Sequence, residues 1–271
     1  MSGTVICTDS SAQLPADIAA ALAVLVVPIE IVVDGELHDE DKLDADAFYD
    51  RLAQGARATT SQPSPGRFAE AYSAAASSGA RDVLSIHVDG RVSGTIRSAE
   101  LAAREAPVPV SVFDTRTASF GVGIAVLTAA EAVAAEASVK EATALVERLT
   151  PRIGNVFVAG SAPGGRIPNV QGLPVFSFLG AAATPLGACE SLEAAADGMA
   201  AHVLSFEGLL RAAVGHADAT TAGAADALAD ALAGSDRIVE IVRYRVGPSV
   251  GAHTGPLSFG AFWWPASPPD E

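Results

Sequence analysis

Short apolar runs alternate with alanine-rich amphipathic stretches along most of this chain, and this alternation constrains the fold more than any other feature. The runs at 4–7, 82–88 and 108–114 are rich in valine and isoleucine and have the length of buried strands. Several stretches between them repeat apolar residues at i, i+3 and i+4, the spacing of a helix that covers a sheet. The sequence therefore predicts an α/β fold with a mostly parallel sheet in its first part.

The number of lobes follows from chain length and from one break in the pattern. A chain of 271 residues with 49% hydrophobic residues can bury one large core or two smaller ones. Pro151 and Gly154 interrupt the periodicity, so we place a boundary near residue 150. We expect an N-terminal α/β lobe over residues 1–150, which carries the polar loops, and a second, smaller α/β lobe over residues 151–271.

Charge and hydropathy exclude several classes of function. Lysine and arginine number 17 against 32 acidic residues, and the net charge of −15 repels phosphate backbones, so we expect no nucleic-acid partner. No apolar run approaches the roughly 18 residues that cross a bilayer, and the first residues lack the pattern of a secretory signal. We expect a cytoplasmic protein that is not embedded in a membrane. Cys7 and Cys189 lack metal or redox spacing and are expected to be core residues.

Hydroxyl and glycine residues cluster where the predicted strands end. The clusters lie at 8–11, 59–64, 93–95, 115–123 and 247–256. Because the carboxyl ends of parallel strands meet at one edge of a sheet, we expect a polar rim there that includes Ser10 and Ser119. The alternative for each hydroxyl is that it only caps a helix.

Ser93 is the most informative of these hydroxyls. It precedes Gly94 and Thr95 at the expected start of a helix, where free N–H groups and the positive end of the helix dipole favour an anion. Thr60 stands just before a proline-containing loop that enters another helix, and it can deliver a second hydroxyl if the two loops meet. Together, Ser93 and Thr60 would hold a carboxylate.

Familiar catalytic motifs are missing. The sequence has no phosphate-binding P-loop, no H-E-x-x-H and no G-x-S-x-G, and Gly121 and Gly123 lack the third glycine of a dinucleotide fingerprint. We expect no cofactor and no metal. Among the histidines, only His253 lies in a predicted glycine-rich loop that could present it to a ligand. It is either a ligand contact or a structural histidine bonded to its own loop.

Several blocks, taken in order and spacing, resemble the DegV family of bacterial acyl-binding proteins. They span residues 5–123 densely and residues 247–256 near the end. The blocks read V-I-C-T-D-S-S-A-Q-L-P, V-V-P-I, T-S-Q-P-S, V-S-G-T-I-R-S-A-E-L-A-A, F-D-T-R-T-A-S-F-G-V-G and G-A-H-T-G-P.

This resemblance implies two α/β lobes around one long-chain fatty acid. The tail would lie in an apolar tunnel between the lobes, which the C-terminal lobe closes, and the carboxylate would lie at the rim. Thr60 and Ser93 match the family's carboxylate ligands, and His253 matches the histidine of its G-A-H-T-G-P segment. A separate fatty acid kinase would phosphorylate the carboxylate, and the acyl phosphate would go on to phospholipid synthesis, which makes the protein an acyl carrier.

The second lobe departs from the family pattern. Cys189 and Glu190 stand where a basic residue is expected, and Leu257 follows Gly255 and Pro256 where the family has a second glycine. These departures predict that lipid binding survives while acceptance by a typical kinase is weak.

An enzyme is the competing hypothesis. Ser93 or Ser10 would be the nucleophile and His253 the base of a hydrolase or of a phosphoryl-transfer component. The sequence identifies no acid partner for His253 and no oxyanion donors, so we favour a binding protein without turnover of its own. A purely structural module is a third interpretation that stays open.

Overall fold

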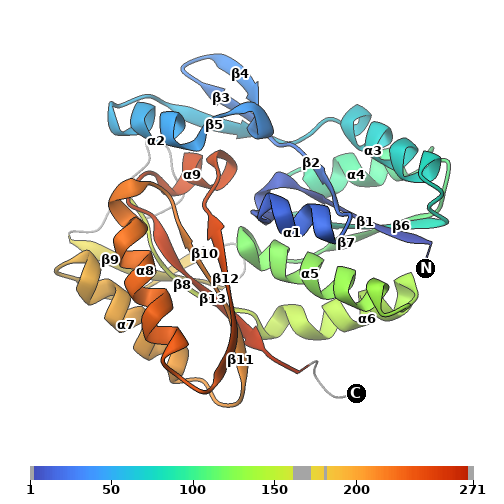
Figure 1. The fold of residues 1–271 in the computed structure, drawn as a ribbon. Coiled ribbons are helices and arrows are strands. Elements are labelled where there is room, and N and C mark those ends of the chain that lie inside the picture. Colours follow the sequence, from blue (N-terminus) through green and yellow to red (C-terminus); the bar gives the residue numbers. More distant parts are fainter. Residues whose placement is uncertain (1–2, 161–171, 180–181, 268–271) are drawn as a thin grey trace. The chain divides into compact units, whose positions relative to one another are not determined.

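A computed structural model describes residues 3–160, 172–179 and 182–267, and the chain forms two compact units. The first unit combines residues 1–30 with residues 61–151, and the second combines residues 31–60 with residues 152–271. The two units are described separately below, with the elements labelled in Figure 1.

The first unit is built on a four-stranded sheet in the order β2-β1-β6-β7. Its strands are β1 (Thr4–Asp9), β2 (Leu25–Val27), β6 (Asp82–His87) and β7 (Val110–Asp114). Every neighbouring pair is parallel, and Cys7 of β1 lies opposite Ser85 of β6. The α/β fold with a parallel sheet is therefore confirmed, and the β-branched runs at 4–7, 82–88 and 108–114 mark three of its strands.

Helices cover both faces of this sheet (Figure 1). They are α1 (Ala16–Ala21), α3 (Pro65–Ser77), α4 (Thr95–Ala103), α5 (Phe120–Ala134) and α6 (Val139–Leu149), and a short 3-10 turn, η1 (Ser10–Ala12), follows β1. Cys7 and Val83 pack with α3 and α4, whereas Ile6, Leu84 and Ile86 pack with α5 and α6. Successive residues of a strand face opposite sides, so β1 and β6 are apolar on both faces.

The second unit contains a six-stranded sheet in the order β10-β9-β8-β13-β11-β12. Its strands are β8 (Gly154–Val158), β9 (Leu173–Leu179), β10 (Ala182–Cys189), β11 (Leu210–His216), β12 (Ile238–Arg245) and β13 (Phe259–Pro265). Only β11 and β12 pair in parallel. Two helices, α7 (Leu192–Leu204) and α8 (Ala219–Ala233), pack on it through alanine, leucine and valine side chains. The second lobe was expected to be the smaller, yet its sheet has more strands than that of the first unit.

Residues 31–60 belong to the second unit, not to the N-terminal lobe in which the sequence placed them. They contain most of a three-stranded sheet in the order β4-β3-β5, with α2 (Ala45–Ala53) between β4 and β5. The strands are β3 (Glu30–Val33), β4 (Glu36–Asp39) and β5 (Ala58–Ser61). Tyr49 of α2 donates a 2.8 Å hydrogen bond to the Val246 carbonyl, and Glu40 accepts one of 2.7 Å from the Ser249 amide. These bonds connect residues 31–60 to α9 (Pro248–Thr254) and to Val246 just before it. The order of the elements along the sequence does not indicate this connection.

The apolar run at 24–33 was predicted to be one strand, but the structure divides it. Pro28, which lacks an N–H group, separates β2 from β3. The next amide, that of Ile29, donates a 2.9 Å hydrogen bond to Ser10 Oγ instead of a ladder partner. The run therefore forms two short strands that serve different sheets.

The two cysteines have different surroundings. Cys7 is fully buried in β1, and burial raises the pKa of its thiol to about 12. Cys189, at the end of β10, is partly buried and packs against the hydrophobic core of the second unit. Within residues 3–160, 172–179 and 182–267, no helix is both long and apolar enough to span a bilayer.

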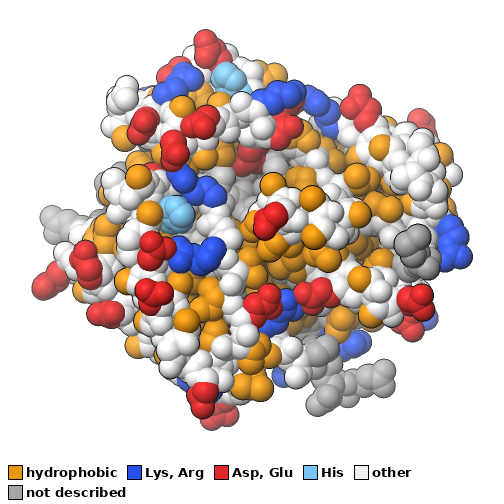
Figure 2. Space-filling model, viewed as in Figure 1, with side chains coloured by type: hydrophobic (Ala, Val, Ile, Leu, Met, Phe, Trp, Pro, Cys, Tyr) orange, Lys and Arg blue, Asp and Glu red, His pale blue; other side chains and the backbone are white. Residues whose placement is uncertain are grey.

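Acidic side chains are spread over the visible face of the molecule and do not gather in one patch (Figure 2). This distribution accords with a net charge of −15.

Candidate functional site

The first group of candidate residues lies in the loop between β6 and α4. Asp89 organises this loop, because its backbone carbonyl accepts hydrogen bonds from the Val92 and Ser93 amides at 3.0 and 3.2 Å. Its carboxylate accepts from the Arg91 amide at 2.8 Å and from the Arg91 guanidinium. Burial opposes ionisation of Asp89, but the hydrogen bonds from Arg91 outweigh it and hold the carboxyl pKa below its usual value. These hydrogen bonds therefore hold the loop, and with it Ser93, in one conformation.

Ser93, Gly94 and Thr95 stand together where α4 begins, as expected from the sequence. Ser93 Oγ lies 2.8 Å from Thr95 Oγ1 and also accepts from the Thr95 amide at 3.3 Å. A Cβ at position 94 would lie 2.8 Å from the amide end of the Gln62 side chain, so a larger residue there would require this exposed side chain to move. Thr95 is buried, whereas Ser93 remains partly exposed.

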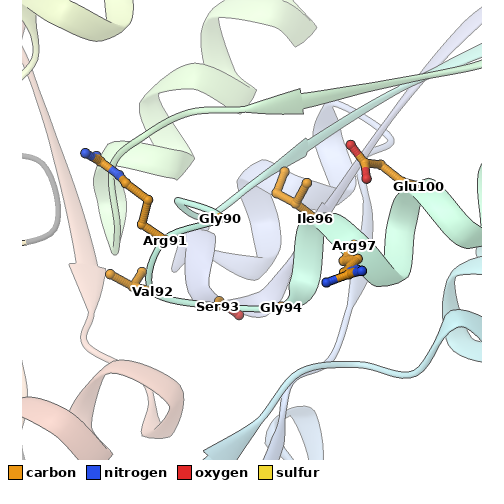
Figure 3. A pocket seen from close by; sticks show the side chains of 8 residues that line it. All are labelled: Gly90, Arg91, Val92, Ser93, Gly94, Ile96, Arg97 and Glu100. Atoms are coloured by element: carbon orange, nitrogen blue, oxygen red, sulfur yellow. The ribbon is translucent and has the colours of Figure 1, made fainter.

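Ser93 opens onto a hollow of about 520 Å³ on the first unit (Figure 3). The hollow is lined by Gly90, Arg91, Val92, Ser93, Gly94, Ile96, Arg97 and Glu100. It therefore brings one hydroxyl close to two arginines, in a chain with an excess of acidic residues.

The second group of candidate residues lies in the second unit. Thr60 of β5 and His253 of α9 form a hydrogen-bonded pair, with Thr60 Oγ1 at 2.9 Å from His253 Nε2. Both side chains are partly exposed. The sequence placed His253 in a loop, but it lies in the last turn of a short helix that starts at Pro248 and ends before Gly255, whose φ is 73°. Proline at the first helical position and glycine after the last one are ordinary helix boundaries, so the glycine-rich pattern marked a helix and not a loop.

Ser10 and Ser119 both lie in the first unit, at the starts of η1 and α5. Ser10 Oγ accepts the Ile29 amide, and the Ser10 carbonyl accepts the amide and the side chain of Gln13. Ser119 precedes α5 with a φ of 54° and makes no capping bond with its side chain. The engagement of Ser10 with Ile29 gives no support to Ser10 as a nucleophile.

The sequence did not lead us to predict a hydrogen-bonded network of buried polar side chains beneath α3. His87 Nδ1 lies 2.8 Å from Asp9 Oδ2, His87 Nε2 lies 2.7 Å from Ser85 Oγ, and Ser85 Oγ lies 2.9 Å from Tyr72 Oη. Asp9 also accepts from the amide and the hydroxyl of Ser11. The four side chains of this network, Asp9, His87, Ser85 and Tyr72, have 0% exposure. Ser85 therefore cannot reach a substrate in this conformation.

The buried hydrogen-bonded network links the ends of two neighbouring strands. Asp9 is the last residue of β1 and His87 is the last residue of β6. Each strand leads directly into a loop with a candidate residue, Ser10 after β1 and Ser93 after β6. The spacing of Ser85 and His87 by two residues was the available signal, since it places both on one face of a strand.

The described part of the chain contains no group of three or more histidine, cysteine, aspartate or glutamate side chains that could hold a metal ion.

Comparison with known proteins places the chain in a family. The model of a family described as uncharacterised protein, DegV family, matches residues 4–266. A DegV domain-containing protein of Deinococcus radiodurans is 43% identical over 152 residues, which cover 54% of this chain and 53% of that protein. A DegV domain-containing protein of Streptomyces coelicolor is 32% identical over 278 residues, which cover 94% of this chain and 96% of that protein.

Solved structures give the same result. A DegV family protein of Thermus thermophilus, described as binding fatty acid, is 29% identical, with a TM-score of 0.88 over 97% of this chain and 99% of that one. DegV of Bacillus subtilis, described as a fatty acid binding protein, is 23% identical, with a TM-score of 0.85 over 97% and 99% of the two chains, which supports the fold. On the strength of a family match over residues 4–266 and a relative that is alike along nearly its whole length, this chain belongs to the DegV family.

Proposed function

We propose that this protein binds one long-chain fatty acid and holds its carboxylate with hydroxyl donors from Ser93 and Thr60. The observation that carries the proposal is the likeness to the Thermus thermophilus protein, which is described as binding fatty acid and matches 97% of this chain. The partly exposed hydroxyls of Ser93 and Thr60 support it, because each lies in a loop or strand end with further polar groups beside it.

The pairing of Thr60 with His253 suits a carboxylate ligand. When His253 Nε2 carries a proton, it donates to Thr60 Oγ1, and the hydroxyl proton of Thr60 is free to point at a ligand oxygen. His253 thus prepares Thr60 as a donor to the ligand and lies beside the ligand carboxylate in this proposal. A hydrogen bond from such a hydroxyl to a charged acceptor stabilises the complex by about 1.5–3 kcal/mol.

The acyl tail supplies most of the binding free energy in this proposal. Each buried CH₂ contributes about 0.8 kcal/mol. An apolar tunnel for the tail, expected from the sequence, stays a prediction. Gly94, Thr95, Ser10 and Ser119 support the head-group loops in this proposal, with Thr95 holding Ser93 and Ser10 holding Ile29.

We propose an acyl carrier without turnover of its own, whose ligand a separate kinase would phosphorylate for phospholipid synthesis. The surroundings of Cys189 and Glu190 make a typical kinase a poor partner. Glu190 precedes α7, Ser191 caps that helix through the Ala194 amide at 3.1 Å, and Glu193 lies in its first turn. An acidic helix start repels a phosphoryl group.

Titration of the delipidated protein with acids of increasing length tests the proposal. We expect affinity to rise from octanoate to palmitate, since each added CH₂ contributes about 0.8 kcal/mol, and we expect hexadecanol to bind more weakly than palmitate because it has no charge. Isothermal titration calorimetry measures both comparisons. Palmitate that fails to bind, or that binds no better than octanoate, would remove fatty-acid binding from the account.

A further inference from the structure

Arg97 is an exposed arginine of the hollow. It lies in the first turn of α4 and lines the hollow together with Ser93 and Gly94 (Figure 3). Within the residues that the structure describes, its guanidinium makes no hydrogen bond and no ion pair. Arg91, the other arginine of the hollow, is by contrast bound to the Asp89 carboxylate through Nε and Nη2, which form one edge of its guanidinium.

Arg97 occupies a position that is unfavourable for a cation, although solvent screens much of this effect at an exposed side chain. The first turn of a helix carries partial positive charge, which favours acidic residues and disfavours cations. The first turn of α4 contains no acidic residue that would offset Arg97. Glu100 lines the same hollow, but its side chain and that of Arg97 leave α4 in different directions (Figure 3). A bound anion would convert this unfavourable arrangement into a favourable one.

The hollow therefore combines a hydroxyl donor, Ser93, with an exposed guanidinium that forms no ion pair within the described residues. A guanidinium presents planar N–H donors that match the two oxygens of a carboxylate, and it keeps its charge at any pH near neutrality. A hydroxyl alone hydrogen-bonds a carboxylate, an alcohol and an ester alike, whereas a guanidinium distinguishes the ionised group.

We propose that Arg97 is a specificity-determining residue that supplies the counter-charge for the ligand carboxylate and selects ionised fatty acids over neutral lipids of the same chain length. This inference rests on the proposed function and adds the residue by which the head group is recognised. In this arrangement Ser93 orients the head group by a hydrogen bond, and Arg97 forms an ion pair with the ionised carboxylate.

The experiment compares Arg97→Gln with Arg104→Gln in the full, delipidated chain. Arg104 is exposed at the far end of α4, so its replacement makes the same change in net charge on the same helix without touching the hollow. Dissociation constants are measured for palmitate and hexadecanol. We expect Arg97→Gln to weaken palmitate binding about tenfold or more and to leave hexadecanol binding within about twofold, while Arg104→Gln changes neither. Arg97→Lys, which keeps the charge but loses the planar donors, should fall between Arg97→Gln and the unaltered protein.

Two results would overturn the role of Arg97 alone. One is unchanged palmitate affinity in Arg97→Gln, and the other is an equal loss of palmitate and hexadecanol, which would mark Arg97 as a structural residue. Retained hexadecanol binding shows that the variant is folded. If the unaltered protein binds neither lipid, the proposed function and this inference fail together, whereas normal palmitate binding by both the unaltered protein and Arg97→Gln rejects only the inference.

Discussion

Replacement of Asp9 by alanine is expected to lower the free energy of unfolding of the first unit by about 3–5 kcal/mol. Asp9 has 0% exposure and accepts from His87, from the Ser11 amide and from the Ser11 hydroxyl. Without the carboxylate, these donors stay buried with no acceptor, and each unmade hydrogen bond costs free energy. Urea unfolding followed by circular dichroism measures the change.

Glu105→Ala is the matched control for this prediction. Glu105 is an exposed carboxylate of the same unit, beyond the end of α4, and its loss should change stability by about 0.5 kcal/mol or less. A loss below about 1 kcal/mol in Asp9→Ala would show that the donors left by the missing carboxylate find other acceptors, and it would contradict the stabilising role that we assign to Asp9. His87→Ala combined with Asp9→Ala should cost less than the sum of the two single variants, because the two residues act on each other.

The second large effect concerns the head group of the ligand. Thr60→Val and Ser93→Ala should each weaken fatty-acid binding about tenfold or more, since each removes a hydrogen bond to a charged acceptor worth about 1.5–3 kcal/mol. Ser73→Ala, which removes an exposed hydroxyl on α3, is the control and should leave the affinity unchanged. Calorimetric titration with palmitate measures all three variants.

The double variant tests whether the two hydroxyls serve one carboxylate. If they do, the loss in Thr60→Val combined with Ser93→Ala should differ from the sum of the single losses by at least about 0.5 kcal/mol. Strictly additive losses would indicate that the two hydroxyls act independently of each other. Unchanged affinity in both single variants, with the fold intact, would remove both residues from the head-group site.

The strands of the first unit could be predicted because their sequence signal is local. The runs at 4–7, 82–88 and 108–114 are β-branched and apolar on both faces, which is the pattern of a strand between two helical layers. The run at 24–33 carries the same signal but contains Pro28, and only the bond from Ile29 to Ser10 shows that the chain leaves one sheet there.

The assignment of residues 31–60 to the second unit could not be predicted from the sequence. It depends on bonds between α2 and residues near α9, such as that from Tyr49 to Val246, which are separated by 197 positions. Hydrophobic periodicity identifies α2 as a helix with one apolar face, but it does not indicate which distant element covers that face.

The candidate site divides in the same way. Ser93, Gly94 and Thr95 could be predicted at a helix start, because the signal lies in neighbouring residues, although α4 begins after Gly94 without a capping hydrogen bond from a side chain. Two other features depend on strand pairing and on which helix covers the strands. They are the contact of Thr60 with His253 and the hydrogen-bonded network that includes Asp9 and Tyr72. Those relations arise only when the sheet has formed.

Mass spectrometry of the organic extract from the purified, untreated protein tests fatty-acid binding most directly. The account predicts free long-chain fatty acid at close to one molecule per chain, and a marked drop in that ratio for the double variant Thr60→Val with Ser93→Ala. An extract with no fatty acid above the level of a control protein purified in the same way, from a chain that also fails to bind added palmitate, would contradict it.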